Sequence, residues 1–331
     1  MLLTAAAERC ILSKRAQGIA EGTIKTYRQS VGHLIAHSGD RPIQSYTPHD
    51  IDLMANALSD MGNQDSTINR ITDNLSAIFK WAIWVGDLKV TRNPVQGRRR
   101  RPVRPKERLR IPLESFGPLL AQEGHERDRI LIAVGLMMFL RQSELAALRI
   151  RDVDMNENVI YVYVKKTNEA DRMTIPQELR PFMRSWLTYY SQEVGPLKPD
   201  YYLIPAKTRI TEGSTLKPDS KMNKIAQIVK AWLERGGFEM DEGEGCHTLR
   251  RSGALAYFRA LSDRGVDDAL RIVMSMLHHK QVSTTEIYLG LKSEAERRNK
   301  ILDGQPMFPG LNAENVVRIG DADGDRRTAA V

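Results

Sequence analysis

The sequence predicts a mainly α-helical chain with a small β-sheet, an α+β fold made of two domains. Apolar residues recur at helical spacing through most of the first hundred residues, as in Ile51, Met54 and Leu58. The alternation typical of a strand stands out only later, at residues 159–164. The chain has 331 residues, which is enough for two domains that each bury a core.

The first domain is expected at residues 1–97 as a helical bundle. Residues 13–93 contain four or five helical stretches that short polar breaks separate. Thr47 with Pro48, and Ser66 with Thr67, are typical of helix starts, because proline is tolerated in a first turn. No alternation of the strand type competes with this interpretation.

A basic linker is expected at residues 98–110. This segment has eight Lys or Arg and one Glu, a net charge of +7 in a chain whose total is +8. Pro102 and Pro105 disfavour a regular helix. The segment could be a solvated surface loop, but its place between two folded units favours a strap across DNA phosphates. The candidate phosphate contacts are Arg98, Arg99, Arg100, Arg101 and Arg104.

The second domain is expected at residues 111–305 and mixes helices with a hairpin. A strand at 159–164 and a partner at 173–176 flank a polar turn at 165–168. Helices are expected at residues 113–124, 127–148, 221–233, 248–261, 267–277, 284–289 and 293–302. Residues 306–331 are small and polar, and we expect a flexible C-terminal tail.

Composition excludes several classes of protein. Cys10 and Cys246 are the only cysteines, too few for a disulfide framework, and they form no CxxC pair for metal or redox chemistry. The N-terminus lacks a signal pattern, and the apolar run at 130–140 is too short to cross a bilayer. We therefore expect a cytoplasmic protein with no membrane partner, no metal and no cofactor.

Six residues of the second domain form a set that could act on a phosphodiester. Breaking that bond requires a nucleophile, positive groups that stabilise charge on the non-bridging oxygens, and a proton donor for the leaving oxygen. The candidates are Arg141, Lys166, His247, Arg250, His279 and Tyr288.

Each candidate has a role that its chemistry favours. Arg141 and Arg250 suit a phosphate clamp, because a guanidinium donates two parallel hydrogen bonds and keeps its charge. Lys166, in a turn, would give a proton to the leaving 5′ oxygen. His247 would share a helix face with Arg250 and accept the tyrosine proton.

The two remaining candidates lie close to the C-terminal end of the second domain. His279 would add a hydrogen bond to the phosphate, and Tyr288 would be the nucleophile. Taken singly, every residue also has an ordinary structural interpretation. Arg141 could pair with Glu144, Lys166 could be solvated, His279 could cap a helix, and Tyr288 could pack in a core. Only the ordered set indicates catalysis.

The same motifs resemble those of the tyrosine recombinase (phage integrase) family. The family's first-arginine motif is similar to residues 139–145 (FLRQSEL), and its His-x-Leu-Arg box to residues 247–251 (HTLRR). Its final box, with histidine nine positions before the tyrosine, resembles residues 276–288. Lys166, followed by Thr167 and later by Arg172, resembles the family's hairpin lysine.

The first domain resembles the family's core-binding domain. The similar positions are Thr23, Tyr27, residues 66–68 (STI) and residues 93–95 (NPV), so the resemblance covers about residues 13–302. The sequence departs from the family at two positions, because His278 stands where glycine is usual and Arg251 where histidine is frequent. No segment for arm-type DNA sites is expected before residue 13, which suggests short recombination sites.

The resemblance implies a site-specific recombinase that cuts and rejoins DNA through a 3′-phosphotyrosyl intermediate at Tyr288. Its partners would be double-stranded recombination sites and copies of itself, a dimer on one site and a tetramer in synapsis, with an accessory directionality factor as a further partner. Integration or excision of phage or mobile-element DNA is the preferred role, in a bacterial or phage-infected cell. The alternatives are a Xer-like chromosome or plasmid resolvase and a DNA-binding protein that does not cleave.

Overall fold

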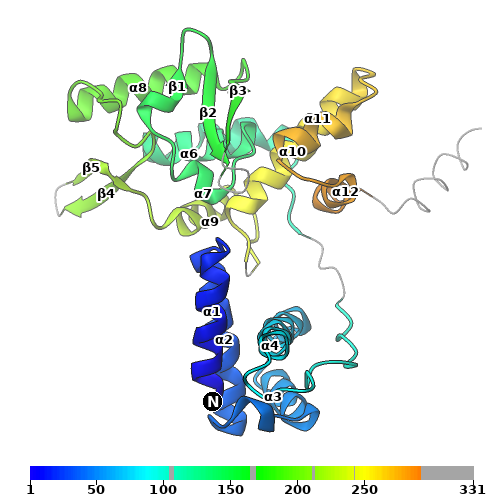
Figure 1. Cartoon of the computed structure of the whole chain (residues 1–331). Coiled ribbons are helices and arrows are strands. Elements are labelled where there is room, and N and C mark those ends of the chain that lie inside the picture. The colour runs from blue at the N-terminus through cyan, green and yellow to red at the C-terminus, as the bar shows by residue number, and fades with distance from the viewer. Residues whose placement is uncertain (104–107, 165–168, 211–212, 242, 292–331) are drawn as a thin grey trace, which may run out of the picture. The chain divides into compact units, whose positions relative to one another are not determined.

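The computed structural model describes residues 1–103, 108–164, 169–210, 213–241 and 243–291. The chain divides into two compact units, Met1–Glu107 and Arg108–Val331, each with a core of its own (Figure 1). The expected helix at 293–302, the tail at 306–331, Lys166 and Arg104 lie outside the described residues. Among the described residues no helix is both long and apolar enough to cross a membrane.

The first unit is a bundle of helices around a single apolar core. Its elements are α1 (Leu3–Ala16), α2 (Glu21–Ser38), η1 (Ile43–Ser45), α3 (Pro48–Asp60) and α4 (Asp65–Val85). α1 begins well before residue 13, where we expected helices to start, because Leu3, Ala6 and Cys10 form one buried face. α3 begins as predicted at Pro48, where the Asp50 carboxylate accepts a 2.7 Å hydrogen bond from the Thr47 N–H.

The second unit combines helices with two antiparallel sheets. Its elements are η2 (Leu113–Ser115), α5 (Phe116–Ala121), α6 (Glu126–Met137), α7 (Gln142–Leu145), η3 (Ile150–Asp152), β1 (Val153–Asp154), β2 (Val159–Val164), β3 (Glu169–Thr174), α8 (Arg180–Val194), β4 (Pro205–Ile210), β5 (Gly213–Lys221), α9 (Ile225–Arg235), α10 (Cys246–Asp263), α11 (Ala269–Met276) and α12 (Val282–Leu289). The strand orders are β1-β2-β3 and β4-β5. The predicted α+β fold class is therefore confirmed.

The β2–β3 hairpin has a different second strand from the one that we predicted. β3 covers Glu169–Thr174 and pairs with all of β2, whereas we placed the partner at 173–176. The sequence of β3 is mostly polar, and Met173 is its one apolar side chain that reaches the core. Alternation therefore identified β2, where Ile160 and Val162 are buried, but not its neighbour.

The predicted helix at 127–148 is two helices joined by a sharp turn. α6 ends at Met137, and Phe139 takes a left-handed conformation with φ of 53° before α7 begins at Gln142. A phenylalanine at positive φ is uncommon. The turn places Arg141 outside α6, whose apolar side chains pack in the core of the unit.

Close packing between α6 and α10 depends on a glycine. A Cβ atom at Gly253 would lie 1.7 Å from the carbonyl oxygen of Leu136 on α6. No side chain fits at this contact without moving the two helices apart. Gly253 therefore fixes the spacing of the helices that lead to Arg141 and that carry Arg250.

Candidate active site

The first component of the site is the turn between α6 and α7. The Arg141 backbone N–H donates to Glu144 Oε2 at 2.7 Å, and Arg141 Nη1 donates to Glu144 Oε1 at 2.8 Å. Glu144 is buried, whereas the Arg141 side chain remains 31% exposed. The carboxylate thus holds Arg141 at both its backbone and its guanidinium and leaves part of that group accessible.

The second component is the N-terminal part of α10. This helix begins at Cys246, so His247 and Arg250 lie one turn apart, as we expected. Arg250 is 1% exposed and donates to the carbonyl oxygens of Phe139 and Leu277, the latter at 2.6 Å. Two terminal nitrogens carry four N–H groups, so these two bonds do not use all the donors of this buried guanidinium.

The third component is the segment that follows α11. The carbonyl oxygen of Leu277 accepts hydrogen bonds from Arg141 at 3.1 Å and from Arg250 at 2.6 Å. Glu144 also lies 3.7 Å from Arg250 Nη1. One carbonyl oxygen and one carboxylate therefore hold the two arginines beside each other.

Tyr288, on α12, and His279, between α11 and α12, complete the site. The two rings pack edge to face with centroids 5.4 Å apart, and His279 Nδ1 lies 3.0 Å from Thr285 Oγ1. The Tyr288 hydroxyl donates to the backbone oxygen of His247 at 3.4 Å, and the Arg250 guanidinium carbon lies 6.0 Å from the Tyr288 ring centroid. The phenol is thus next to the arginine pair.

The electrostatics favour a protonated tyrosine beside a neutral histidine. Burial raises the pKa of Tyr288 to about 12, although Arg250 and its neighbours oppose the shift. Desolvation, and then the positive charges of Arg250, Arg251 and Arg141, lower the pKa of His247. An imidazole of lowered pKa is uncharged at neutral pH and can accept a proton.

His278 occupies a backbone conformation that glycine adopts most easily. Its φ is 49°, in the left-handed region, which costs a residue with a Cβ about 1–2 kcal/mol. The imidazole Nε2 lies 2.9 Å from Asp171 Oδ2 on β3. The side chain therefore fits, and its imidazole reaches β3 of the hairpin.

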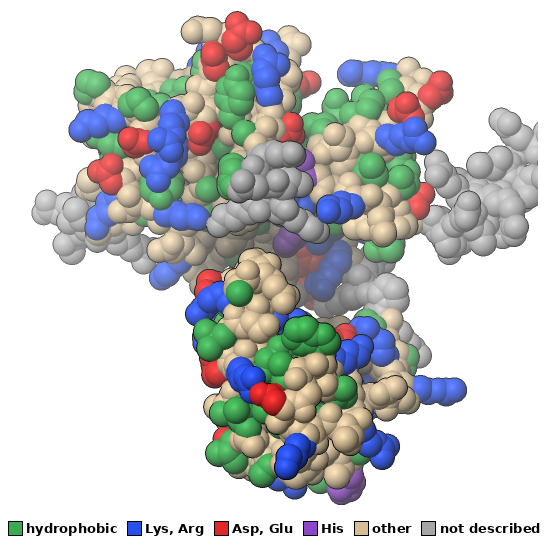
Figure 2. Space-filling view, in the orientation of Figure 1, with side chains coloured by type: hydrophobic (Ala, Val, Ile, Leu, Met, Phe, Trp, Pro, Cys, Tyr) green, Lys and Arg blue, Asp and Glu red, His purple; other side chains and the backbone are tan. Residues whose placement is uncertain are grey.

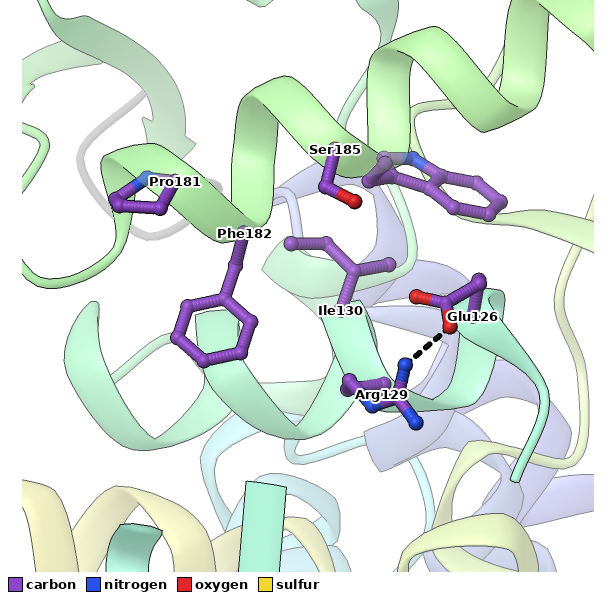
Figure 3. A pocket seen from close by; sticks show the side chains of 7 residues that line it. Glu126, Arg129, Ile130, Pro181, Phe182 and Ser185 are labelled. Carbon is purple, nitrogen blue, oxygen red and sulfur yellow. Dashed lines mark hydrogen bonds and ion pairs between the residues drawn. The ribbon is translucent and has the colours of Figure 1, made fainter. Parts of the chain in front are cut away.

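An open hollow of about 430 Å³ adjoins the site. Arg141 and His247 line it together with exposed polar residues, among them Gln142, Lys221 and Asn223. Arg141, His247 and Lys221 give part of its wall basic character, which suits a phosphate-bearing ligand, while Ala146 and Met222 make another part apolar. A separate hollow of about 260 Å³ lies between α6 and α8, where Phe182 and the Arg129–Glu126 ion pair face it (Figure 3). None of the candidate catalytic residues lines this second hollow.

The structure thus brings five of the six predicted residues together: Arg141, His247, Arg250, His279 and Tyr288. Lys166 lies outside the described residues. Sequence reasoning treated Glu144 only as an alternative partner for Arg141 and did not find the Leu277 carbonyl. A glutamate three residues after an arginine was a usable signal, whereas a backbone acceptor leaves none.

Residues 98–101 of the expected linker belong to the first unit. Arg98 pairs with Asp52 at 3.2 Å, Arg100 with Asp73 at 3.1 Å, and Arg101 with Asp65 at 3.1 Å. The neighbouring Arg99 is exposed. Lys and Arg side chains are also spread over the visible faces of both units, mixed with acidic ones (Figure 2). The arginines of the run are therefore not equivalent.

The described residues contain no group of three His, Cys, Asp or Glu side chains that could hold a metal ion. The two cysteines are buried. The site as described offers guanidinium, imidazole and phenol groups, which together can bind a phosphate and supply a nucleophile.

Two known protein families match the chain over separate ranges. Residues 118–294 match the phage integrase family, and residues 13–86 match the N-terminal SAM-like domain of phage integrases. The tyrosine recombinase XerA of Thermococcus kodakarensis is 24% identical over 282 residues, 85% of this chain and 89% of that protein.

Solved structures of lambda integrase share the fold at low sequence identity. A dimer bound to a COC′ core site has a TM-score of 0.67 at 17% identity, covering 89% of this chain and 97% of that one. A tetramer bound to a Holliday junction has a TM-score of 0.66 at 16% identity, covering 87% of this chain and 77% of that one.

Fold and site together define a tyrosine-type site-specific recombinase, an enzyme that cleaves and joins DNA strands. The family model covers more than half of the chain, and the chain belongs to the phage integrase family.

Proposed function

We propose that Tyr288 attacks the scissile phosphate of a recombination site and forms a 3′-phosphotyrosyl bond. The phenolic oxygen bonds to phosphorus, the bond from phosphorus to the 5′ oxygen breaks, and a free 5′ hydroxyl results. The observation that carries this proposal is that Arg141 and Arg250 share the Leu277 oxygen while Arg250 lies beside the Tyr288 ring. Their guanidinium groups would bind the non-bridging oxygens.

Two residues would move the protons in this step. His247, with its lowered pKa, would accept the proton of Tyr288, which a pKa of about 12 otherwise keeps on the phenol. Lys166 would give a proton to the leaving 5′ oxygen, a role that rests on the sequence. His279 would add a hydrogen bond to the phosphate. Because the new bond keeps the energy of the old one, a 5′ hydroxyl can reverse the step without ATP.

Residues 1–97 would form the core-type DNA-binding domain, residues 98–110 the basic linker and residues 111–305 the catalytic domain. Arg99 and Arg100 are both exposed, but Arg100 pairs with Asp73, so Arg99 is the best candidate for a free phosphate contact. The others would contact DNA from positions that their acidic partners already fix. Arg104 would contact a DNA phosphate, as the sequence predicts. The C-terminal tail would begin at residue 306.

The partner would be double-stranded DNA, with a dimer of this chain on each site and a tetramer in synapsis. Lambda integrase, whose fold is similar, has been solved as a dimer on a core site and as a tetramer on a Holliday junction. A directionality factor would be a further partner. The enzyme would act in the cytoplasm, where the DNA lies.

Integration and excision of phage or mobile-element DNA are the role that we prefer. A second role, Xer-like resolution of chromosomes or plasmids, is compatible with the names of curated relatives such as XerA and XerC. Recombination assays separate the two. Integration requires joining of two different sites on separate molecules, whereas resolution requires deletion between two identical direct repeats. A product in only one assay decides between them.

A nicked suicide substrate tests the chemistry. Release of a short fragment next to the scissile phosphate traps the covalent adduct, which denaturing gels detect. We expect adduct with the unaltered protein, none with Tyr288→Phe, and equal DNA binding by both. Tyr161→Phe, which alters an exposed tyrosine on β2, is the matched control and should form adduct normally. Adduct from Tyr288→Phe would rule out this nucleophile, and no adduct from any form would favour a binding protein that does not cleave.

A further inference from the structure

The contact between His278 and Asp171 joins two parts of the second unit that lie far apart in the sequence. His278 Nε2 and Asp171 Oδ2 are 2.9 Å apart, and the side chains are 16% and 44% exposed. Asp171 belongs to β3, and His278 lies between α11 and α12. Figure 1 shows both elements within the second unit, where β3 is green and α11 and α12 are orange.

On one side of this contact is the segment that organises the site. Leu277 presents its carbonyl oxygen to both arginines, and the His279 ring packs against the Tyr288 ring. His278 lies between these two residues. Each residue of the segment 277–279 therefore contacts a different partner: the arginines, Asp171 and Tyr288. Leu277 is fully buried and its carbonyl is held by both arginines, so this segment is fixed without His278 and can anchor the contact with β3.

On the other side is the strand that follows Lys166 along the chain. Asp171 pairs with Val162 of β2, and its side chain lies on the same face of the strand as Met173, because residues two apart share a face. Met173 is buried in the core of the unit. The core thus fixes β3 at Met173. The contact with His278 fixes the strand two residues earlier, at Asp171.

The backbone conformation of His278 indicates that the contact is more than incidental. With φ of 49°, glycine would adopt this position without strain, and among the described residues the hydrogen-bond partner of the imidazole is Asp171. What the side chain adds at this position is its hydrogen bond to β3. The hydrogen bond to Asp171 is therefore the feature of this histidine on which an inference can rest.

We infer that Asp171 and His278 are a positioning pair, which ties β3 to residues 277–279 and so holds this strand in register with the arginine–tyrosine site. The inference rests on the proposed function, because it assigns the pair to the step in which the 5′ oxygen leaves. Neither residue touches the phosphate.

The test compares His278→Gly, Asp171→Ala and the double variant in single-turnover cleavage of the suicide substrate. We expect each single variant to cleave about 10- to 100-fold more slowly at unchanged DNA affinity, since small misplacements of catalytic groups cost this much. The double variant should be no slower than either single variant. The control is Glu157→Ala, which removes an exposed carboxylate that pairs with Arg172, the neighbour of Asp171 on β3. This variant should cleave normally.

A second substrate separates positioning from a general loss of structure. When sulfur replaces the bridging 5′ oxygen, the thiolate leaves without a proton, so a misplaced proton donor no longer limits the rate. We expect this substrate to restore the slow variants, and Lys166→Ala with them, to within about threefold of the unaltered protein. A merely structural defect would persist.

The outcomes also separate the inference from the proposed function. No adduct from the unaltered protein overturns the proposed function. Adduct at the normal rate from His278→Gly, additive losses in the double variant, or slow cleavage of the sulfur substrate overturns the positioning pair alone.

Discussion

Arg141 and Arg250 donate hydrogen bonds to the same atom, the carbonyl oxygen of Leu277, at 3.1 and 2.6 Å. Glu144 contacts both guanidinium groups as well, at 2.8 and 3.7 Å. The two arginines are therefore held beside each other within the protein, and in the proposed mechanism DNA would not have to bring them together. Groups that are placed before the reaction stabilise a transition state without reorganisation.

The role of Glu144 can be measured with Glu144→Gln. Loss of the buried negative charge leaves the deeply buried Arg250 without a counter-charge, so we expect the free energy of unfolding of the second unit to fall by about 1–3 kcal/mol. The cleavage rate should fall as well, because Arg141 loses its main support. Urea titration and the suicide substrate measure the two effects. Glu178→Gln, at an exposed position, is the control, and equal behaviour of the two variants would contradict the role.

The contact between α6 and α10 predicts a severe effect for a single methyl group. Gly253→Ala places a Cβ 1.7 Å from the Leu136 oxygen, and we expect it to destabilise the second unit by about 2 kcal/mol or more. Gly117→Ala in α5 meets open space and should be neutral or stabilising by up to about 1 kcal/mol. Thermal or urea unfolding of both variants checks this. Equal stability would mean that the helices are not in close contact.

The pKa of His247 predicts the acid limb of the pH profile. The base must be uncharged to accept a proton, and its pKa is lowered from 6.5, so cleavage should persist as the pH falls and decline only below pH 6.5. Tyr288, with a pKa of about 12, stays protonated through this range and adds no limb of its own. Single-turnover rates between pH 5 and 9 measure the midpoint. A midpoint above 6.5, or an unchanged limb in His247→Gln, would contradict the assignment.

The basic run predicts two kinds of arginine. Arg99 is exposed, so Arg99→Ala should lower the slope of log affinity against log salt by about 1 and leave stability unchanged. Arg101 contacts Asp65 and Ser59, so Arg101→Ala should instead reduce the stability of the first unit by about 1 kcal/mol. DNA-binding titrations at several salt concentrations, together with urea unfolding, distinguish them. The same salt slope in Arg99→Ala and the unaltered protein would contradict the phosphate contact.

Hydrophobic spacing in the sequence predicted most helices and strand β2. The predicted start of α10, at residue 248, is two residues from the observed start at Cys246, because apolar residues recur there at helical spacing. The spacing missed the break after Met137, since a left-handed residue such as Phe139 leaves no mark on periodicity. It also missed the β4–β5 hairpin, whose polar side chains lack alternation, and α8, where we predicted no element.

The candidate site was predictable in its side chains and not in their supports. Arg141, His247, Arg250, His279 and Tyr288 could be named because phosphoryl chemistry needs those functional groups and because their order resembles the motifs of the tyrosine recombinase family. The hydrogen bond between His278 and Asp171 could not, because it joins residues more than one hundred positions apart and no local pattern links them. Supports of this kind depend on tertiary structure.

The shared acceptor of the two arginines has a consequence for how such a protein can diverge. The Leu277 side chain is fully buried, so selection at this position acts on the size and shape of the side chain. The carbonyl, in contrast, is present whatever amino acid stands there. Any apolar replacement that preserves the path of the main chain keeps the acceptor. A family alignment would therefore show a preference for an apolar side chain at this position and would not show that the carbonyl oxygen holds the two arginines.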